Sequence, residues 1–98
     1  RDFIYVDDVA KAISRLIETT GVSGIFNIGS GKSTTVKYLV DTLKSKMGFE
    51  VQNQAFEESP ALTADINKIT KTCGWTPEVS IEQGVKKFVD WKDLGTRE

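Results

Sequence analysis

The sequence predicts an α/β fold with about four helices and two to three short strands. Apolar residues recur at helical spacing in four stretches, and a short apolar run lies between two glycines, as in a buried strand. Residues that favour helix caps and turns separate these stretches. With 98 residues, 39% hydrophobic and 28% charged side chains, the chain has the size and composition of one globular unit, residues 1–98.

The first part of the chain predicts a helix followed by a strand. Four apolar residues share one face of the helix, namely Val9, Ile13, Leu16 and Ile17. Asp7 or Asp8 can cap its start, and Gly21 follows its end. Residues 24–28 predict a buried strand, and the Gly-Ser-Gly at residues 29–31 predicts a tight turn.

A second helix is predicted directly after that turn. Its apolar face consists of Val36, Leu39, Val40, Leu43 and Met47. Ser33 or Thr34 is expected to cap this helix, and Gly48 is expected to end it. Residues 50–56 are more polar and predict a strand near the edge of a sheet.

The last part of the chain predicts two more helices. A short one is lined by Ile66, Ile69 and Cys73. Asp65 can cap this short helix and Gly74 can end it. Ser80, with Gln83 three residues later, forms a capping-box pattern before the final helix. The apolar stripe of the final helix consists of Ile81, Val85, Phe88 and Val89.

Charge balance and rare residue types exclude several kinds of site. Lys plus Arg number 13 and Asp plus Glu number 14, so no basic excess predicts binding to nucleic acid or to an anionic membrane. The chain has no His, which excludes His-based catalytic triads and His metal ligands. Its single cysteine, Cys73, is expected to be a buried, inert thiol in a cytoplasmic protein. No apolar run has the length of a membrane span.

Residues 29–34 look like a phosphate-binding loop but lack its spacing. They include Gly-Lys-Ser between a predicted strand and a predicted helix. Such a loop needs a glycine five residues before the one that precedes Lys32, and Phe26 stands at that position. The third glycine of a Gly-x-Gly-x-x-Gly dinucleotide motif is also missing. We therefore expect a structural turn that leads into a helix.

Five side chains stand out as candidates for chemistry or for the core. Adjacent carboxylates at Asp7 and Asp8 could form an acid/base or metal pair, but their position favours helix capping. Trp75 and Trp91 are expected to anchor the core. Arg1 opens a strand-like run and could hold a phosphate or carboxylate with two hydrogen bonds. The alternative for Arg1 is a solvated chain end.

Several sequence blocks together resemble a known family. The blocks are RDFIYVDDVA at 1–10, FNIGSGK at 26–32, ADINK at 64–68, GWTP at 74–77 and EQG at 82–84, followed by Val89 and Trp91. Taken together, they resemble the C-terminal part of extended short-chain dehydrogenases, the NAD-dependent epimerase/dehydratase family that acts on nucleotide-sugars. The resemblance covers nearly the whole chain, from Arg1 to about Trp91.

The resemblance implies a fragment of a Rossmann-like protein. Residues 1–98 would form its C-terminal substrate-binding segment, with the dinucleotide-binding domain upstream and outside this chain. An opening on Arg1 without Met fits a chain cut from a longer protein. The family's catalytic Tyr-x-x-x-Lys pair is missing, because Val9 follows Tyr5 at the fourth position and Thr42 follows Tyr38. We therefore expect no catalytic, cofactor-binding or metal-binding residue here, and NAD or NADP only in the parent protein.

By the same resemblance, Arg1 would contact the phosphates of a nucleotide-sugar. Many members carry a second arginine in an Arg-Pro-Gly-Asp stretch, where this sequence has Phe-Glu-Glu-Ser at 56–59. Glu58 could accept a hydrogen bond from a ribose hydroxyl. The implied function is that of the nucleotide-sugar-binding portion of an epimerase, dehydratase or reductase, and this portion would be inactive by itself. The alternative is a non-enzymatic binding or interaction module.

We also expect the isolated chain to self-associate.

Overall fold

The described residues form four helices and no strand. The computed structural model describes residues 1–50 and 61–96, with α1 at Val6–Glu18, α2 at Val36–Met47, α3 at Asn67–Cys73 and α4 at Ile81–Thr96. The molecule measures 49 × 39 × 16 Å, so the helices lie in a single thin layer. Its Cα radius of gyration is 16.1 Å, whereas a compact domain of about 100 residues has roughly 13 Å.

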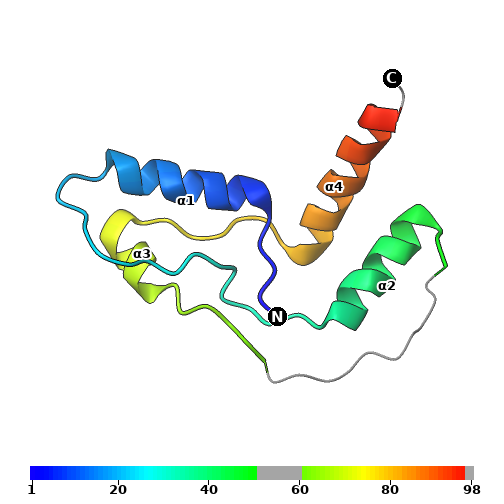
Figure 1. The fold of residues 1–98 in the computed structure, drawn as a ribbon, viewed down its shortest axis with the longest axis horizontal. Helices are drawn as coiled ribbons and strands as arrows, with labels where there is room; N and C mark the ends of the chain where they lie inside the picture. The colour runs from blue at the N-terminus through cyan, green and yellow to red at the C-terminus, as the bar shows by residue number, and fades with distance from the viewer. Residues whose placement is uncertain (51–60, 97–98) are drawn as a thin grey trace.

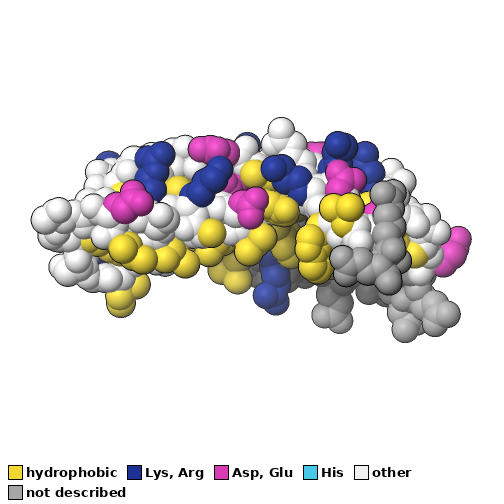
Figure 2. Space-filling view, turned by 90° about the horizontal axis from the view of Figure 1, so that it is seen from above, with side chains coloured by type: hydrophobic (Ala, Val, Ile, Leu, Met, Phe, Trp, Pro, Cys, Tyr) yellow, Lys and Arg dark blue, Asp and Glu magenta, His cyan; other side chains and the backbone are white. Residues whose placement is uncertain are grey.

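The helices pack as two pairs. α1 lies against α3 in one half of the molecule, and α2 lies against α4 in the other half, as Figure 1 shows. We call these the α1/α3 half and the α2/α4 half. Viewed edge-on, most of the apolar side chains in sight gather on one broad face and most of the charges on the other (Figure 2). Exposed apolar side chains are therefore concentrated on one side of the layer.

The buried core belongs to the α1/α3 half. Ala12 and Ile69 are completely buried, and Trp75 is 2% exposed. Partly buried residues surround these three: Ile4, Leu16, Phe26, Ile28, Ile66 and Cys73. Cys73 is half-buried rather than fully buried as predicted, and its thiol donates to the carbonyl of Ile69.

The predicted apolar face of helix α1 is only partly buried. Ala12 and Leu16 belong to the core, whereas Ile13 and Ile17 on the same helix are exposed, as are Val6 and Ala10. The cap prediction was also wrong, because the N-cap residue is Tyr5 and its side chain makes no capping hydrogen bond. Neither neighbouring aspartate sits at the N-cap position, since the helix already begins at Val6.

The other three helices begin and end close to the predicted residues. Thr35, rather than Ser33 or Thr34, caps α2 by accepting a hydrogen bond from the Tyr38 amide. Gly48 and Gly74 end α2 and α3 with φ of +70° and +73°, a region that glycine adopts without steric cost.

The predicted capping box before α4 is confirmed, whereas Asp65 is not the N-cap of α3. Ser80 and Gln83 form the capping box, with the Ser80 amide donating at 3.0 Å and the Gln83 amide at 3.1 Å. Asp65 accepts from the Asn67 amide at the start of α3, although the N-cap position itself is Ile66.

The strand predictions are not supported. Residues 24–28 and 1–5 form no strand, and within the described part of the chain no backbone ladder pairs residues 24–28 with another segment. A strand needs a neighbour to accept and donate its backbone hydrogen bonds, so an apolar run alone does not make one. Ile25 is 84% exposed, and its carbonyl accepts from the Lys68 ammonium at 2.6 Å. In the strand predicted at 50–56, residues 51–56 lie outside the described residues.

The two tryptophans differ in their environment. Trp75 is a core anchor, as predicted, and its indole nitrogen donates to the carbonyl of Asp8 at 3.0 Å. Trp91 is 69% exposed on α4 and stacks at a tilt on Phe88, with ring centroids 6.1 Å apart. The prediction that Trp91 anchors the core was therefore wrong, because its side chain lies mostly in solvent on α4.

Candidate functional site

Arg1 lies at the rim of an open cleft of about 610 Å³. The cleft is lined by Arg1, Asp2, Asn27, Ile28, Gly29, Leu62, Thr63, Ala64 and Asp65. Three segments that are distant in sequence thus meet around one predicted site residue. The second predicted site residue, Glu58, lies outside the described residues.

The backbone of Arg1 is fixed against the segment that leads into α2. The Arg1 nitrogen donates to the Thr34 carbonyl at 2.8 Å, and the Thr34 amide donates back to the Arg1 carbonyl at 2.8 Å. The side chain of Arg1 is exposed, and no ion pair with it is found among the described residues. The guanidinium is therefore available to an anionic ligand in the cleft.

Asp2 holds the three cleft segments together. One carboxylate oxygen accepts from the Ser30 amide at 2.8 Å and from the Ser30 hydroxyl. The other oxygen accepts from the Gly31 amide at 3.1 Å and from the Ala64 amide at 3.0 Å. Burial raises the pKa of Asp2, but the hydrogen bonds from Ser30, Ala64 and Gly31 outweigh it, so the pKa lies below its ordinary value of 3.8.

Gly29 permits the close approach of these segments. A Cβ at Gly29 would lie 2.6 Å from the Cβ of Ala64 and 2.7 Å from a carboxylate oxygen of Asp2. Both contacts are too short for real atoms, so the cleft wall requires glycine at this position. The sequence pattern predicts Gly29 only as part of a tight turn and does not indicate this close approach.

The glycine turn does not form a phosphate cradle around Lys32. The backbone donors of Ser30 and Gly31 are directed at Asp2, so they are not free to bind a nucleotide phosphate. Lys32 instead lines a second cleft, of about 360 Å³, which Glu82 also lines. This geometry agrees with the rejection of a nucleotide-hydrolysing loop on spacing.

Glu82 forms a polar contact between the two helices of its half. It accepts a hydrogen bond from the Tyr38 hydroxyl, which raises the pKa of Tyr38 and lowers that of Glu82. Both side chains are exposed to solvent. The contact joins α2 to the first turn of α4.

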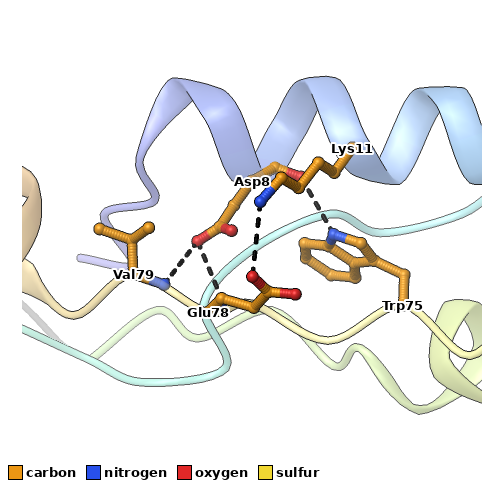
Figure 3. A network of polar contacts seen from close by, with 5 residues as sticks. All are labelled: Asp8, Lys11, Trp75, Glu78 and Val79. Carbon is orange, nitrogen blue, oxygen red and sulfur yellow. Dashed lines mark hydrogen bonds and ion pairs between the residues drawn. The ribbon is translucent and has the colours of Figure 1, made fainter.

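Asp8 is buried and bridges α1 to the loop that leads into α4 (Figure 3). Its Oδ2 accepts from the backbone amides of Glu78 at 3.2 Å and Val79 at 3.0 Å, while Oδ1 has no hydrogen-bond partner among the described residues. Above this bridge, Lys11 and Glu78 form an exposed ion pair at 3.4 Å. Asp7 is exposed, so the two adjacent carboxylates do not form a joint acid/base or metal pair.

No local sequence pattern identifies Asp2 as the residue that organises the site. Its partners lie 28 to 62 residues further along the chain, where no local pattern could reveal them. The only signal in the sequence is its position next to Arg1, in the RDFIYVDDVA block at residues 1–10.

In the described part of the chain, no helix combines the length and the apolar character that a membrane crossing requires.

Comparison with known proteins gives consistent matches. Residues 1–29 match the NAD dependent epimerase/dehydratase family. The dTDP-4-dehydro-6-deoxyglucose reductase of Escherichia coli is 32% identical over 93 residues, which are 91% of this chain and 29% of the reductase.

Two solved structures share the arrangement of this chain. The UDP-glucose 4-epimerase of Thermotoga maritima with UDP-glucose is 33% identical and covers 98% of this chain with a TM-score of 0.82; the match is 32% of the epimerase. The enzyme WbmF of Bordetella bronchiseptica with NADH is 26% identical and covers 99% of this chain with a TM-score of 0.85; the match is 30% of that enzyme.

These relatives are Rossmann-fold enzymes that act on nucleotide-sugars or bind a nicotinamide cofactor. The chain spans only about a third of the length of the curated relatives it matches. The matches support a relationship between this chain and part of the NAD dependent epimerase/dehydratase family.

Proposed function

We propose that the chain is the C-terminal, substrate-side portion of an NAD(P)-dependent nucleotide-sugar epimerase, dehydratase or reductase. The observation that carries the proposal is the exposed guanidinium of Arg1 at a cleft of about 610 Å³. Small-molecule sites in proteins have volumes of about 300–1,000 Å³. The relatives in complex with UDP-glucose or UDP support the same class of ligand.

Each side chain of the cleft suits one part of such a ligand. Arg1 can bind a diphosphate with two parallel hydrogen bonds, which fix its orientation as well as its charge. Asn27 and Thr63 are exposed polar residues that line the cleft and can bind hydroxyl groups. Asp65 already uses one carboxylate oxygen at the start of α3, so its other oxygen is the one that can accept from a sugar or ribose hydroxyl. Glu58 remains a second proposed acceptor.

The cofactor and the hydride chemistry are assigned to residues outside this chain. NAD or NADP would need a glycine turn with free backbone donors for its pyrophosphate. The turn at residues 29–31 does not fit, since its donors are held by Asp2. This chain would therefore bind and orient the substrate while the upstream residues carry out proton and hydride transfer.

The decisive experiment compares Arg1 with Lys32 in the full-length protein. We expect Arg1→Ala to weaken UDP binding by about 1.5–3 kcal/mol, or roughly 10- to 150-fold, because a charge-assisted hydrogen bond is lost. Lys32→Ala is the matched control, since it removes a nearby cation that lines a different cleft. Titration calorimetry with UDP measures the binding affinity of both variants. Equal losses would contradict the assignment of the site, as would micromolar binding of NAD to residues 1–98 alone.

A non-enzymatic binding module is the second candidate. It is favoured by the Phe-Glu-Glu-Ser at 56–59, which replaces the second cationic side chain that many members of the family carry. The sequence upstream of Arg1 would distinguish the substrate-binding portion of an enzyme from the non-enzymatic module. A glycine-rich βαβ unit and a Tyr-x-x-x-Lys pair there would support the enzyme, and their absence would support the module.

A further inference from the structure

The turn at residues 29–31 has the hydrogen-bonding geometry of an anion-binding site. We propose that this turn is an oxyanion site whose resident ligand is the carboxylate of Asp2, and that this internal ligand locks the segment carrying Arg1 against the cleft. The inference concerns the turn itself and does not depend on the nucleotide-sugar assignment.

Four hydrogen-bond donors contact the Asp2 carboxylate, two at each of its oxygens. Oδ1 receives the Ser30 amide and hydroxyl, and Oδ2 receives the amides of Gly31 and Ala64. The amide distances are 2.8 to 3.1 Å, which is the range of good hydrogen bonds. Both oxygens of one anion are thus bound, as in sites built for phosphate or carboxylate.

The glycines on both sides of Ser30 serve this geometry. Gly31 has a φ of +73°, a conformation in which successive amides can turn toward the same side of the backbone. Gly29 leaves room for the anion, because a Cβ there would lie 2.7 Å from Oδ2. The Gly-Ser-Gly sequence that resembles a phosphate loop is therefore explained by an anion that the chain supplies itself.

The lock has a direct consequence for Arg1. Asp2 is its sequence neighbour, and the Arg1 backbone is held on its other side by Thr34. Two anchors on adjacent residues fix where the Arg1 side chain leaves the backbone. Asp2 is a positioning residue in this sense, since its own oxygens are already fully engaged.

Chemical rescue tests the proposal directly. In Asp2→Gly the site loses its ligand but gains the space of the removed side chain, which acetate can fill. We expect the midpoint of thermal unfolding to fall by at least about 4 °C, which corresponds to the loss of about one net hydrogen bond in a domain of this size. Sodium acetate should then raise the midpoint in a saturable manner and shift the amide NMR signals of Ser30, Gly31 and Ala64 toward their wild-type positions.

Asp2→Asn is the matched control. Its side chain occupies the site but offers only one acceptor oxygen, so we expect it to be destabilised without being rescued. Sodium chloride at equal ionic strength controls for general salt effects. If Asp2→Gly is unfolded, recovery of helical circular dichroism with acetate replaces the midpoint as readout. No rescue beyond that of chloride, or equal rescue of Asp2→Asn, would overturn the proposal.

Discussion

The α1/α3 half and the α2/α4 half are built from similar amphipathic helices, yet only the first has a closed core. In the α1/α3 half, Trp75 inserts between the helices and is 2% exposed, beside the fully buried Ala12 and Ile69. Helix α2 has no buried residue within its bounds, and Val85 of α4 is the one buried apolar residue among the residues of that half that the structure describes. Helical pairing alone therefore does not close a core here.

The difference comes from what fills the space between the helices. An apolar groove of about 270 Å³ remains between α2, α4 and the chain segment at residues 3–5. Its walls are formed by residues such as Phe3, Leu39, Leu43, Val85 and Phe88. In the α1/α3 half, the loop after α3 supplies the indole of Trp75, which is buried in a cluster with Ala12 and Ile69. A core in a layer this thin needs such a third element to exclude water.

The largest expected effect separates the two tryptophans. Trp75→Ala should lower the free energy of unfolding by about 3–5 kcal/mol, because it removes a buried indole and leaves a cavity. Trp91→Ala should change it by less than about 0.5 kcal/mol, since that side chain is 69% exposed. Urea unfolding of both variants measures the contrast. Similar losses for the two would show that the α2/α4 half has a core of its own.

Next in size is an effect on association. We expect the chain to self-associate at micromolar concentration, because α1 exposes an apolar stripe at its outer face, with Ile17 79% exposed. Burying one such side chain contributes about 1.5–3 kcal/mol, so Ile17→Lys should weaken association by roughly 10- to 150-fold. Leu94→Lys, at an exposed position of α4, is the control in the other half. Light scattering that finds a stable wild-type monomer would contradict this prediction.

A smaller effect is expected where Asp8 connects the halves. Asp8→Ala should destabilise the fold by about 1–3 kcal/mol, because it leaves the amides of Glu78 and Val79 without their acceptor. Asp8→Asn should cost less: its amide oxygen can replace Oδ2, and its NH₂ group takes the place of Oδ1, which has no partner among the described residues. Asp7→Ala is the exposed control. Urea unfolding should show the largest loss of unfolding free energy for Asp8→Ala, a smaller loss for Asp8→Asn and the smallest for Asp7→Ala. The reverse order would contradict a stabilising role for the Asp8 bridge.

The smallest expected effect is a pH dependence at Asp2, where the cleft segments meet. Its pKa is lower in the folded state than the ordinary 3.8, so its ionised form stabilises the fold. That contribution is fully present above pH 3.8 and is lost as the pH falls through the lowered folded value. The difference in unfolding free energy between wild type and Asp2→Asn should therefore shrink on acidification below pH 3.8. If the unfolding free energies of wild type and Asp2→Asn kept a constant difference below pH 3.8, the lowered pKa would not belong to Asp2.

Local sequence determined the C-terminal ends of α2 and α3 and the start of α4. Gly48, Gly74 and the Ser80–Gln83 capping box act on backbone groups within four residues, so their effect can be predicted from neighbours alone. The small shift of the α2 cap to Thr35 shows the limit of that local reasoning, because several adjacent hydroxyls could serve. Arg1 stands out in the sequence and lines a cleft in the structure, and its role in ligand binding stays a prediction.

Tertiary structure alone decided which apolar and acidic residues became buried. Trp75 and Trp91 are the same residue type, but only Trp75 lies where a second helix covers it. Residues 24–28 have the composition of a strand and remain unpaired within the described chain, because a ladder needs a partner segment. Asp2 and Asp8 look like ordinary acidic residues in the sequence. Their roles depend on amides 28 to 71 residues away, and only the folded chain brings those donors within hydrogen-bonding distance.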